Sequence, residues 1–332
     1  ATLNDYWNYN EQLYYPVYSG NYNDYEKGKR GKWRVQSNYV FKEQIAGINS
    51  PFASGAPYNA GSGEKTYNAG VYELELFNWK YEGANNDQKW LKLNTTTQYS
   101  PNGNALEEVD ILNISSSAKY GYHSMLPYLV AKNSAYPAVL FESFENQYQS
   151  GGNLYLEDGL RLDPADGVIA TIAHSGSKSL KLVNNPDGLH LAQIAATDHL
   201  LNQGLSLKVW VKTEVSDYTL IQDNLKTDVR LNSNPSVVIT AAGFEKIAQS
   251  GEWTLYEARL IDLSPAITLS DVINIHLKFD FNTSGVQHVW IDDLRMQPLD
   301  AQMTCYVYDV KTLRLIASFD DQHFGLYYQY DE

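Results

Sequence analysis

Two segments of this chain alternate strictly between apolar and polar residues. In residues 205–213 and again in residues 273–281, every second side chain is apolar. A period of two predicts strands of antiparallel sheets, each with one face buried and the other facing solvent. The apolar positions expected to share one core include Leu207, Val209, Ile275, Leu277 and Phe279.

Shorter apolar segments with the spacing of strands lie between these two and on either side of them. Gly, Asn and Pro residues separate them, as expected where tight turns join antiparallel strands. The pattern therefore predicts an all-β fold, with a jelly-roll β-sandwich over residues 137–299. The additional predicted strands are residues 179–183, 236–240, 253–260 and 288–292.

Residues 1–136 have a different character. They hold most of the 26 tyrosines, and only residues 71–77 and 90–93 alternate clearly. We expect an irregular, aromatic-rich β region with long loops. One short helix is predicted at residues 105–112, because acidic residues fill its first turns, where a helix N-terminus favours negative charge.

The last segment, residues 300–332, contains a repeated motif. Tyr306-Val307-Tyr308-Asp309 has a second copy in Tyr328-Gln329-Tyr330-Asp331, at a spacing typical of stacked structural repeats. We expect two or three strands whose outer edge has no partner within this chain, and whose four tyrosines pack as cross-strand neighbours.

This tail resembles the YD-repeat (Rhs-type) family, whose members wind long arrays of β-hairpins. The segments 31–34, 120–127, 131–136, 141–145, 291–295 and 300–303 resemble the region just before the repeats in large surface proteins of the Bacteroidota. The resemblance implies a piece of a longer secreted or cell-surface protein. It also implies that further YD repeats of the same polypeptide are its main partner.

Residues 137–299 resemble the carbohydrate-binding-module and galactose-binding-like superfamily. The segments that carry the resemblance are 141–145, 174–180, 253–257 and 289–294. In those modules a calcium ion binds an acid of the first strand, a Gly-Ser turn and an acid of the last strand. The resemblance therefore implies a structural Ca²⁺ site at Glu142, Ser175 and Asp292, with Glu145 nearby, unless these acids are ordinary exposed residues at strand ends.

Composition excludes several other classes. With 25 basic and 39 acidic residues the formal net charge is -14, which argues against a nucleic-acid partner. The one basic cluster, between Lys27 and Arg34, is expected to be a solvated loop. No apolar run is long enough to span a bilayer, and no signal peptide is visible. The single cysteine, Cys305, excludes an internal disulfide and is expected to be a small buried hydrophobe.

Catalytic motifs are absent from the sequence. The acidic pairs Glu107/Glu108 and Asp292/Asp293 are adjacent, so in a strand they would point to opposite faces rather than across a sugar. The seven histidines form no zinc motif, and His276 is expected to face solvent. We therefore predict no catalytic residue.

Exposed aromatic side chains are the remaining candidates for ligand binding, because the C–H faces of sugars stack on aromatic rings. Trp210 falls on the polar face of its strand, where it would either bind a ligand or pack against a neighbouring domain. Tyr155 and Tyr218 are loop candidates, whereas Trp253 and Trp290 match core positions.

Three hypotheses follow. The leading one is a non-catalytic structural or connecting region of a large YD-repeat protein. The alternative is a glycan-binding module for adhesion or polysaccharide capture. The weakest is a polysaccharide-degrading enzyme.

Overall fold

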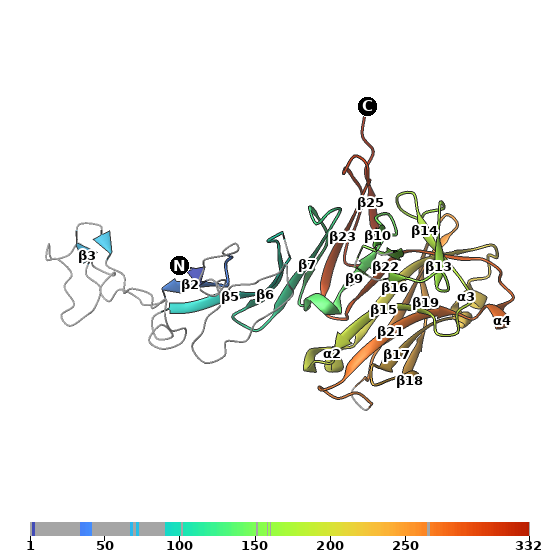
Figure 1. Ribbon diagram of the computed structural model, residues 1–332, viewed down its shortest axis with the longest axis horizontal. Coiled ribbons are helices and arrows are strands. Elements are labelled where there is room, and N and C mark those ends of the chain that lie inside the picture. Colours follow the sequence, from blue (N-terminus) through green and yellow to red (C-terminus); the bar gives the residue numbers. More distant parts are fainter. Residues whose placement is uncertain are drawn as a thin grey trace. The chain divides into compact units, whose positions relative to one another are not determined.

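The computed structural model describes residues 2–3, 34–41, 67–68, 71–72, 90–100, 102–150, 152–157, 159, 161–263 and 266–331 (Figure 1). The chain divides into two compact units. The first comprises residues 1–97 and 108–113, and the second comprises residues 98–107 and 114–332. Most of the basic cluster before Arg34 and most of the segment 71–77 lie outside the described residues.

The described part of the first unit consists of antiparallel strands. Strand β2 (Ser37–Phe41) pairs on one side with β1 (Thr2–Leu3) and on the other with β5 (Trp90–Tyr99). A separate two-stranded hairpin joins β3 (Tyr67–Asn68) and β4 (Val71–Tyr72).

The second unit is built around a sandwich of two antiparallel sheets, as the alternating pattern predicts. The larger sheet has the order β13-β14-β22-β16-β20-β19, with β9 also paired to β22, and the smaller sheet has the order β15-β21-β17-β18. The strands of the larger sheet are β9 (Leu140–Glu142), β13 (Gly167–Ala170), β14 (Ser179–Leu182), β16 (Leu205–Thr213), β19 (Glu245–Ser250), β20 (Trp253–Leu260) and β22 (Val289–Pro298). The strands of the smaller sheet are β15 (Leu189–Ala195), β17 (Leu225–Leu231), β18 (Asn234–Gly243) and β21 (Val272–Phe279).

The predicted core residues lie together between the two sheets. Leu207 and Val209 of β16 belong to the same buried cluster as Ile275, Leu277 and Phe279 of β21. The prediction of a shared core is therefore confirmed.

Strand β16 differs from its prediction in one respect. It is buried on both faces from Leu205 to Val211, not on one face only. The strand lies between β20 and β22 in the sheet, and the C-terminal strands of the chain cover its second face near Lys208, whose amine contacts the carbonyl of Asp321 at 3.5 Å. The residues that looked like a solvent-facing side are thus an internal layer.

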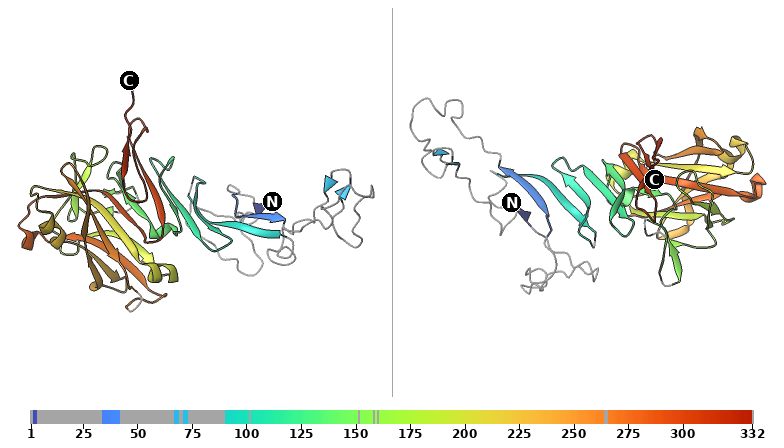
Figure 2. Two further views of the ribbon diagram at one scale, coloured as in Figure 1. Left: turned by 180° about the vertical axis from the view of Figure 1, so that it is seen from behind. Right: turned by 90° about the horizontal axis from the view of Figure 1, so that it is seen from above.

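The C-terminal segment forms three strands, in agreement with the prediction. They are β23 (Gln302–Tyr308), β24 (Leu315–Phe319) and β25 (Gly325–Tyr327), and β23 also pairs with β8 (Leu126–Lys132), which pairs with β7 (Ser115–Gly121). These strands rise beside the sandwich (Figures 1 and 2). A second core, which includes Met303, Cys305 and Phe319, holds them together. Burial raises the pKa of the Cys305 thiol to about 12, as fits a buried hydrophobe rather than a nucleophile.

The four repeat tyrosines do not pack as predicted. Tyr306 contacts Tyr308, with ring centroids 6.5 Å apart, but strand β24 separates both from the second copy of the motif. The Tyr328 hydroxyl instead contacts the Ser318 hydroxyl at 3.1 Å, and the Tyr330 hydroxyl donates to the carbonyl of Leu315 at 2.8 Å.

The predicted helix at residues 105–112 is wrong. Residues Ala105–Asp110 form strand β6, followed by a turn in which the Asp110 carboxylate accepts the N–H of Leu112 at 2.8 Å. The Glu107 carboxylate accepts the N–H of Tyr136 at 2.7 Å. Sheet pairing and this long-range contact override the weak preference of acidic residues for a helix N-terminus.

Several short elements connect the strands of the second unit. A small sheet of its own comprises β10 (Tyr148–Ser150), β11 (Asn153–Tyr155) and β12 (Arg161–Leu162). The short helices are η2 (Tyr136–Ala138), α2 (Asp198–Gln203), α3 (Tyr218–Asn224) and α4 (Phe281–Ser284). None of the helices in the described part of the chain has the length and apolar character of a membrane span.

Candidate functional site

A bulge in β22 creates the most unusual cluster of charged groups in the sandwich. Lys208 lies opposite Arg295 and Trp210 lies opposite Asp292, so β22 carries one more residue than β16 over this stretch. Asp293 has a φ of 47°, in the left-handed region. Such a bulge turns neighbouring side chains away from strict alternation. The prediction that the two aspartates point to opposite faces is therefore wrong.

Both aspartates bind the same short segment. The Asp292 carboxylate accepts the N–H groups of His174 and Ser175, at 2.6 Å and 3.2 Å, and that of Asp293 at 2.8 Å. The Asp293 carboxylate contacts Nδ1 of His174 at 2.7 Å and accepts the Ser175 hydroxyl at 2.7 Å. The acidic pair thus fixes the loop before β14 to the bulge.

Burial strongly affects the protonation of this pair. Both side chains are fully buried. Burial, and then the neighbouring charge of Asp293, raise the pKa of Asp292 well above its usual value, and burial also raises the pKa of Asp293. The pair therefore retains a proton at a pH where exposed aspartates are ionised.

His174 connects this pair to aromatic side chains. Its ring is stacked on Trp210, with centroids 3.9 Å apart, and its Nε2 lies 3.3 Å from the hydroxyl of Tyr327 in β25. The Trp210 side chain is 4% exposed and belongs to a small cluster with Trp253. This placement agrees with the packing alternative for Trp210, since a buried ring offers no face on which a sugar could stack. Trp253 is buried, as expected, whereas Trp290 is only partly buried against the same cluster.

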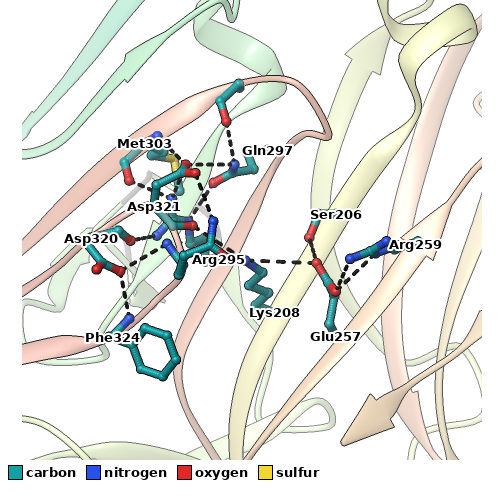
Figure 3. Close-up of polar contacts among 12 residues, drawn as sticks. Ser206, Lys208, Glu257, Arg259, Arg295, Gln297, Met303, Asp320, Asp321 and Phe324 are labelled. Carbon is teal, nitrogen blue, oxygen red and sulfur yellow. Dashed lines mark hydrogen bonds and ion pairs between the residues drawn. The ribbon is translucent and has the colours of Figure 1, made fainter. Parts of the chain in front are cut away.

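A buried arginine forms the second part of the site. The Arg295 guanidinium donates to the carbonyls of Met303 and Asp320 and to the side-chain oxygen of Gln297, and it lies 3.5 Å from the Asp321 carboxylate. Figure 3 shows these contacts converging on Arg295, from Gln297 of the same strand and from Met303, Asp320 and Asp321 of the C-terminal segment. Because Arg295 is fully buried, these carbonyls replace the water that would otherwise solvate its charge.

Next to Arg295, a further set of charges is paired on the same face of the sheet (Figure 3). The Glu257 carboxylate accepts the Ser206 hydroxyl at 2.7 Å and the Arg259 Nε–H at 3.1 Å, and it lies 3.9 Å from the Lys208 amine. Burial lowers the pKa of Lys208, and the charge of Glu257 partly opposes this shift. These polar contacts therefore lie between two layers, the larger sheet and the C-terminal segment that covers it.

The carboxylates predicted to bind calcium accept hydrogen bonds from backbone N–H groups. Glu142 accepts the N–H groups of Phe144 and Glu157 at 2.8 Å and 2.9 Å. Glu145 accepts those of Ser177 and Lys178, both at 2.6 Å. Ser175 does contact Asp292, but through its N–H group.

Among the residues that the structure describes, no three His, Cys, Asp or Glu side chains converge as metal ligands do. Calcium binding by Glu142, Ser175 and Asp292 stays a prediction, which elemental analysis and a melting curve in chelator would test.

The two tyrosine candidates occupy different environments. Tyr155 of β11 lies opposite Tyr148 of β10, and their rings are stacked at 5.2 Å with 13° between planes. Tyr148 is half exposed, so one ring face of this pair is available to solvent. Tyr218 begins α3, and the Lys246 amine lies 4.3 Å from its ring centroid.

A pocket of about 350 Å³ lies next to the small sheet that carries Tyr148 and Tyr155. Leu154 and Leu162 line it from the small sheet, and Pro164 and residues of β13 complete its apolar wall. Amide and guanidinium groups of Gln149, Asn153 and Arg161 also line the pocket.

Sequence patterns did not identify the residues that make the most polar and aromatic contacts in this site. His174, Asp293, Arg295 and Tyr327 are not among the predicted site residues. One signal was available: Arg295 and Gln297 stand at alternate positions of a strand that also contains Trp290. An arginine on the outer face of a central strand indicates that this face contacts either solvent or a second layer of the chain. Here a second layer covers it.

Comparison with protein-family models finds no match, and comparison with curated proteins also finds none. Among solved structures, the CBM22-1 xylan-binding domain of Paenibacillus barcinonensis Xyn10C is similar to this chain with 11% identity and a TM-score of 0.27. The similarity covers 48% of this chain and 93% of that one. The CBM22-1–GH10 modules of Clostridium thermocellum xylanase 10B show 14% identity and a TM-score of 0.26, over 48% of this chain and 28% of that one. A cyclase from Fischerella sp. TAU shows 11% identity and a TM-score of 0.26, over 55% and 96%.

Proposed function

We propose that this chain is a non-catalytic structural region of a secreted or cell-surface protein with Tyr-x-Tyr-Asp repeats. In this proposal the sandwich anchors the C-terminal hairpin strands, and the outer edge of β25 receives further repeats of the same polypeptide. The observation that carries the proposal is the buried Arg295, whose guanidinium binds the carbonyl of Met303 in β23 and that of Asp320 in the turn after β24.

The Arg295 contacts couple the two layers energetically. Hydrogen bonds from a charged group contribute roughly 1.5 to 3 kcal/mol each, and breaking a buried charged network costs about 3 to 5 kcal/mol. A hairpin held in this way moves with the sandwich rather than swinging on a flexible linker. Rigid attachment is what a connecting region needs.

The repeated motif supports the second half of the proposal. Asp309, which ends the first copy, organises the turn between β23 and β24 by accepting the N–H groups of Lys311 and Thr312. Asp331 holds the equivalent position in the second copy. No described strand pairs with the outer edge of β25, so an additional hairpin would extend the sheet there.

Hydrogen exchange on a matched pair of variants tests the anchoring role. Arg295→Met removes the buried guanidinium, whereas Arg259→Met removes an exposed guanidinium that pairs with Glu257. We expect Arg295→Met to increase exchange in β24 and β25 strongly while the sandwich core stays protected, and Arg259→Met to leave both unchanged. Unchanged protection of β24 and β25 in Arg295→Met would show that the arginine does not anchor them.

Glycan binding is the second candidate function, and the stacked pair Tyr148–Tyr155 beside the pocket is the observation that favours it. The half-exposed Tyr148 ring offers a surface on which a sugar can stack, and residues with amide and guanidinium groups that line the pocket at the same small sheet can form hydrogen bonds to a sugar. A glycan array tests this: Tyr155→Ala should abolish any binding at this site, whereas Tyr218→Ala should not. Binding that survives Tyr155→Ala would exclude this pair as the ligand platform.

A further inference from the structure

One histidine is enclosed where the C-terminal segment covers the larger sheet. His323 belongs to the turn between β24 and β25, has a φ of 72° and is fully buried. Its ring is stacked on Phe319 of β24, with centroids 5.0 Å apart, and lies edge-on to Phe141 of β9 at 6.5 Å. The imidazole therefore lies between the C-terminal strands and the sandwich.

Two cationic side chains, Arg295 of β22 and Lys208 of β16, face this ring. Burial, followed by the charges of Arg295, Lys208 and His174, lowers the pKa of His323 well below its usual value, and the backbone of Asp293 opposes this shift. Neither ring nitrogen has a hydrogen-bond partner among the described residues. A proton added to the ring would create a third buried cation with no acceptor to replace the water that it has lost.

The acidic side chains around this interface already accept hydrogen bonds. They are Glu142, Glu257, Asp292, Asp293, Asp320 and Asp321. The two in the turn of His323 bind N–H groups of the turn itself and of β23, so neither is free to neutralise a charge on the imidazole. The Tyr327 hydroxyl and the Cys305 thiol stay neutral, because burial raises the pKa of both.

We propose that residues 320–327, the turn of His323 together with β25, form an acid-sensitive latch that detaches from the sandwich as the pH falls. In the open latch the imidazole meets water and takes up a proton, and the carbonyls of Asp320 and Asp321 leave Arg295 and Lys208. The latch rests on the anchoring role proposed above. When closed it fixes the edge of β25 for the next repeat, and acid releases that edge.

The size of the effect follows from the protonation of the open state. If His323 binds a proton only when the latch is open, with an ordinary pKa of about 6.5, the ratio of open to closed latch rises about 25-fold between pH 7 and pH 5. The buried pair Asp292 and Asp293 opposes this opening little, because its carboxylates bind the loop before β14 and not the turn.

Hydrogen exchange of the whole chain between pH 7 and pH 5, corrected for the intrinsic pH dependence of exchange, tests the latch. We expect the protection of residues 320–327 to start falling near pH 6.5 and to drop at least tenfold by pH 5, while β21 stays protected. In His323→Asn, which tolerates the positive φ and binds no proton, protection should be the same at both pH values. His123→Asn, at an exposed histidine with a φ of 64°, should behave as the unchanged chain does.

Three results would overturn the latch: constant protection of residues 320–327 in the unchanged chain, the same acid-induced loss in His323→Asn, or a loss shared equally by β21. The first and third need no variant, so the test holds even if His323→Asn does not fold. If Arg295→Met exposes β24 and β25 at pH 7 while acid leaves the unchanged chain protected, the anchoring role stands and the latch alone is rejected. If Arg295→Met has no effect, the anchoring role itself fails.

Discussion

His174 lies flat against Trp210, with ring centroids 3.9 Å apart and 16° between the ring planes. The Asp293 carboxylate contacts Nδ1, on the edge of the same imidazole ring, at 2.7 Å. Trp210 is therefore covered by a side chain that is itself fixed by a buried acid. The second face of β16 is therefore buried around Trp210, as a core position is.

Replacing Trp210 tests that character. Trp210→Ala should lower the free energy of unfolding by about 3 to 5 kcal/mol, because it removes a large buried ring and leaves a cavity beneath His174. Chemical denaturation measures the loss, and Tyr218→Ala, at a half-exposed ring, should cost much less. A variant of normal stability that had lost glycan binding would instead assign Trp210 to a ligand.

The core between the two sheets gives a second prediction. Leu277 is fully buried among residues of both sheets, so Leu277→Ala should cost about 2 to 5 kcal/mol. Leu326 in β25 is 67% exposed, and Leu326→Ala should change stability by less than about 0.5 kcal/mol. Denaturant melts of both variants would check the pair, and equal costs would contradict the assigned sandwich.

The sandwich core was predictable because alternation is a local signal. Leu207 and Ile275 lie on apolar faces that period two identifies without knowledge of neighbouring strands. The burial of Lys208 and Arg295 was not predictable in the same way. It depends on which segment covers the second face, and that segment lies at the other end of the chain.

The contacts of the acidic pair were hidden for a related reason. A single extra residue in β22 lets both Asp292 and Asp293 contact the loop before β14, and no sequence pattern marks this bulge because Asp293 is not a glycine. Tyr155, by contrast, was found as a candidate since tyrosines near turns are often exposed. Its partner Tyr148 followed only from the register of β10 and β11.

The pH dependence of stability should show the effect of His323. This residue is fully buried, and burial followed by the charges of Arg295 and Lys208 lowers its pKa well below the usual value. The native state therefore binds fewer protons than the unfolded state, whose histidines titrate near 6.5. The contribution of His323 to stability therefore falls as the pH drops below about 6.5, by up to about 1.4 kcal/mol per pH unit, until the lowered pKa is reached. The raised pKa values of Asp292 and Asp293 act in the opposite direction.

A matched pair of histidines isolates this effect. His323 and His123 both have positive φ, at 72° and 64°, and His123 is exposed. Asparagine tolerates that conformation, so His323→Asn should flatten the decline in unfolding free energy between pH 6.5 and 4.5, whereas His123→Asn should not. The same slope in both variants would mean that His323 titrates normally.

The turn after the first Tyr-x-Tyr-Asp motif provides the last prediction. The Asp309 carboxylate accepts the N–H groups of Lys311 and Thr312 at 3.0 Å and 2.6 Å, and the contacts with Thr312 lower its pKa. Asp309→Ala should therefore cost about 1 kcal/mol at pH 7, in the range of comparable side-chain caps. The stabilisation is present above the unfolded pKa near 3.9 and is lost as the pH falls through the lower folded value.

Asp331 supplies the control and the test of the repeat. In this chain, Asp331→Ala should leave the melting curve unchanged, because the described structure contains no turn for it to organise. In a chain extended after Asp331 by a second copy of residues 310–331, the same change should cost as much as Asp309→Ala. If Asp331→Ala has no effect in the extended chain, the two motifs are not equivalent units, and the edge of β25 is not where a further repeat is added.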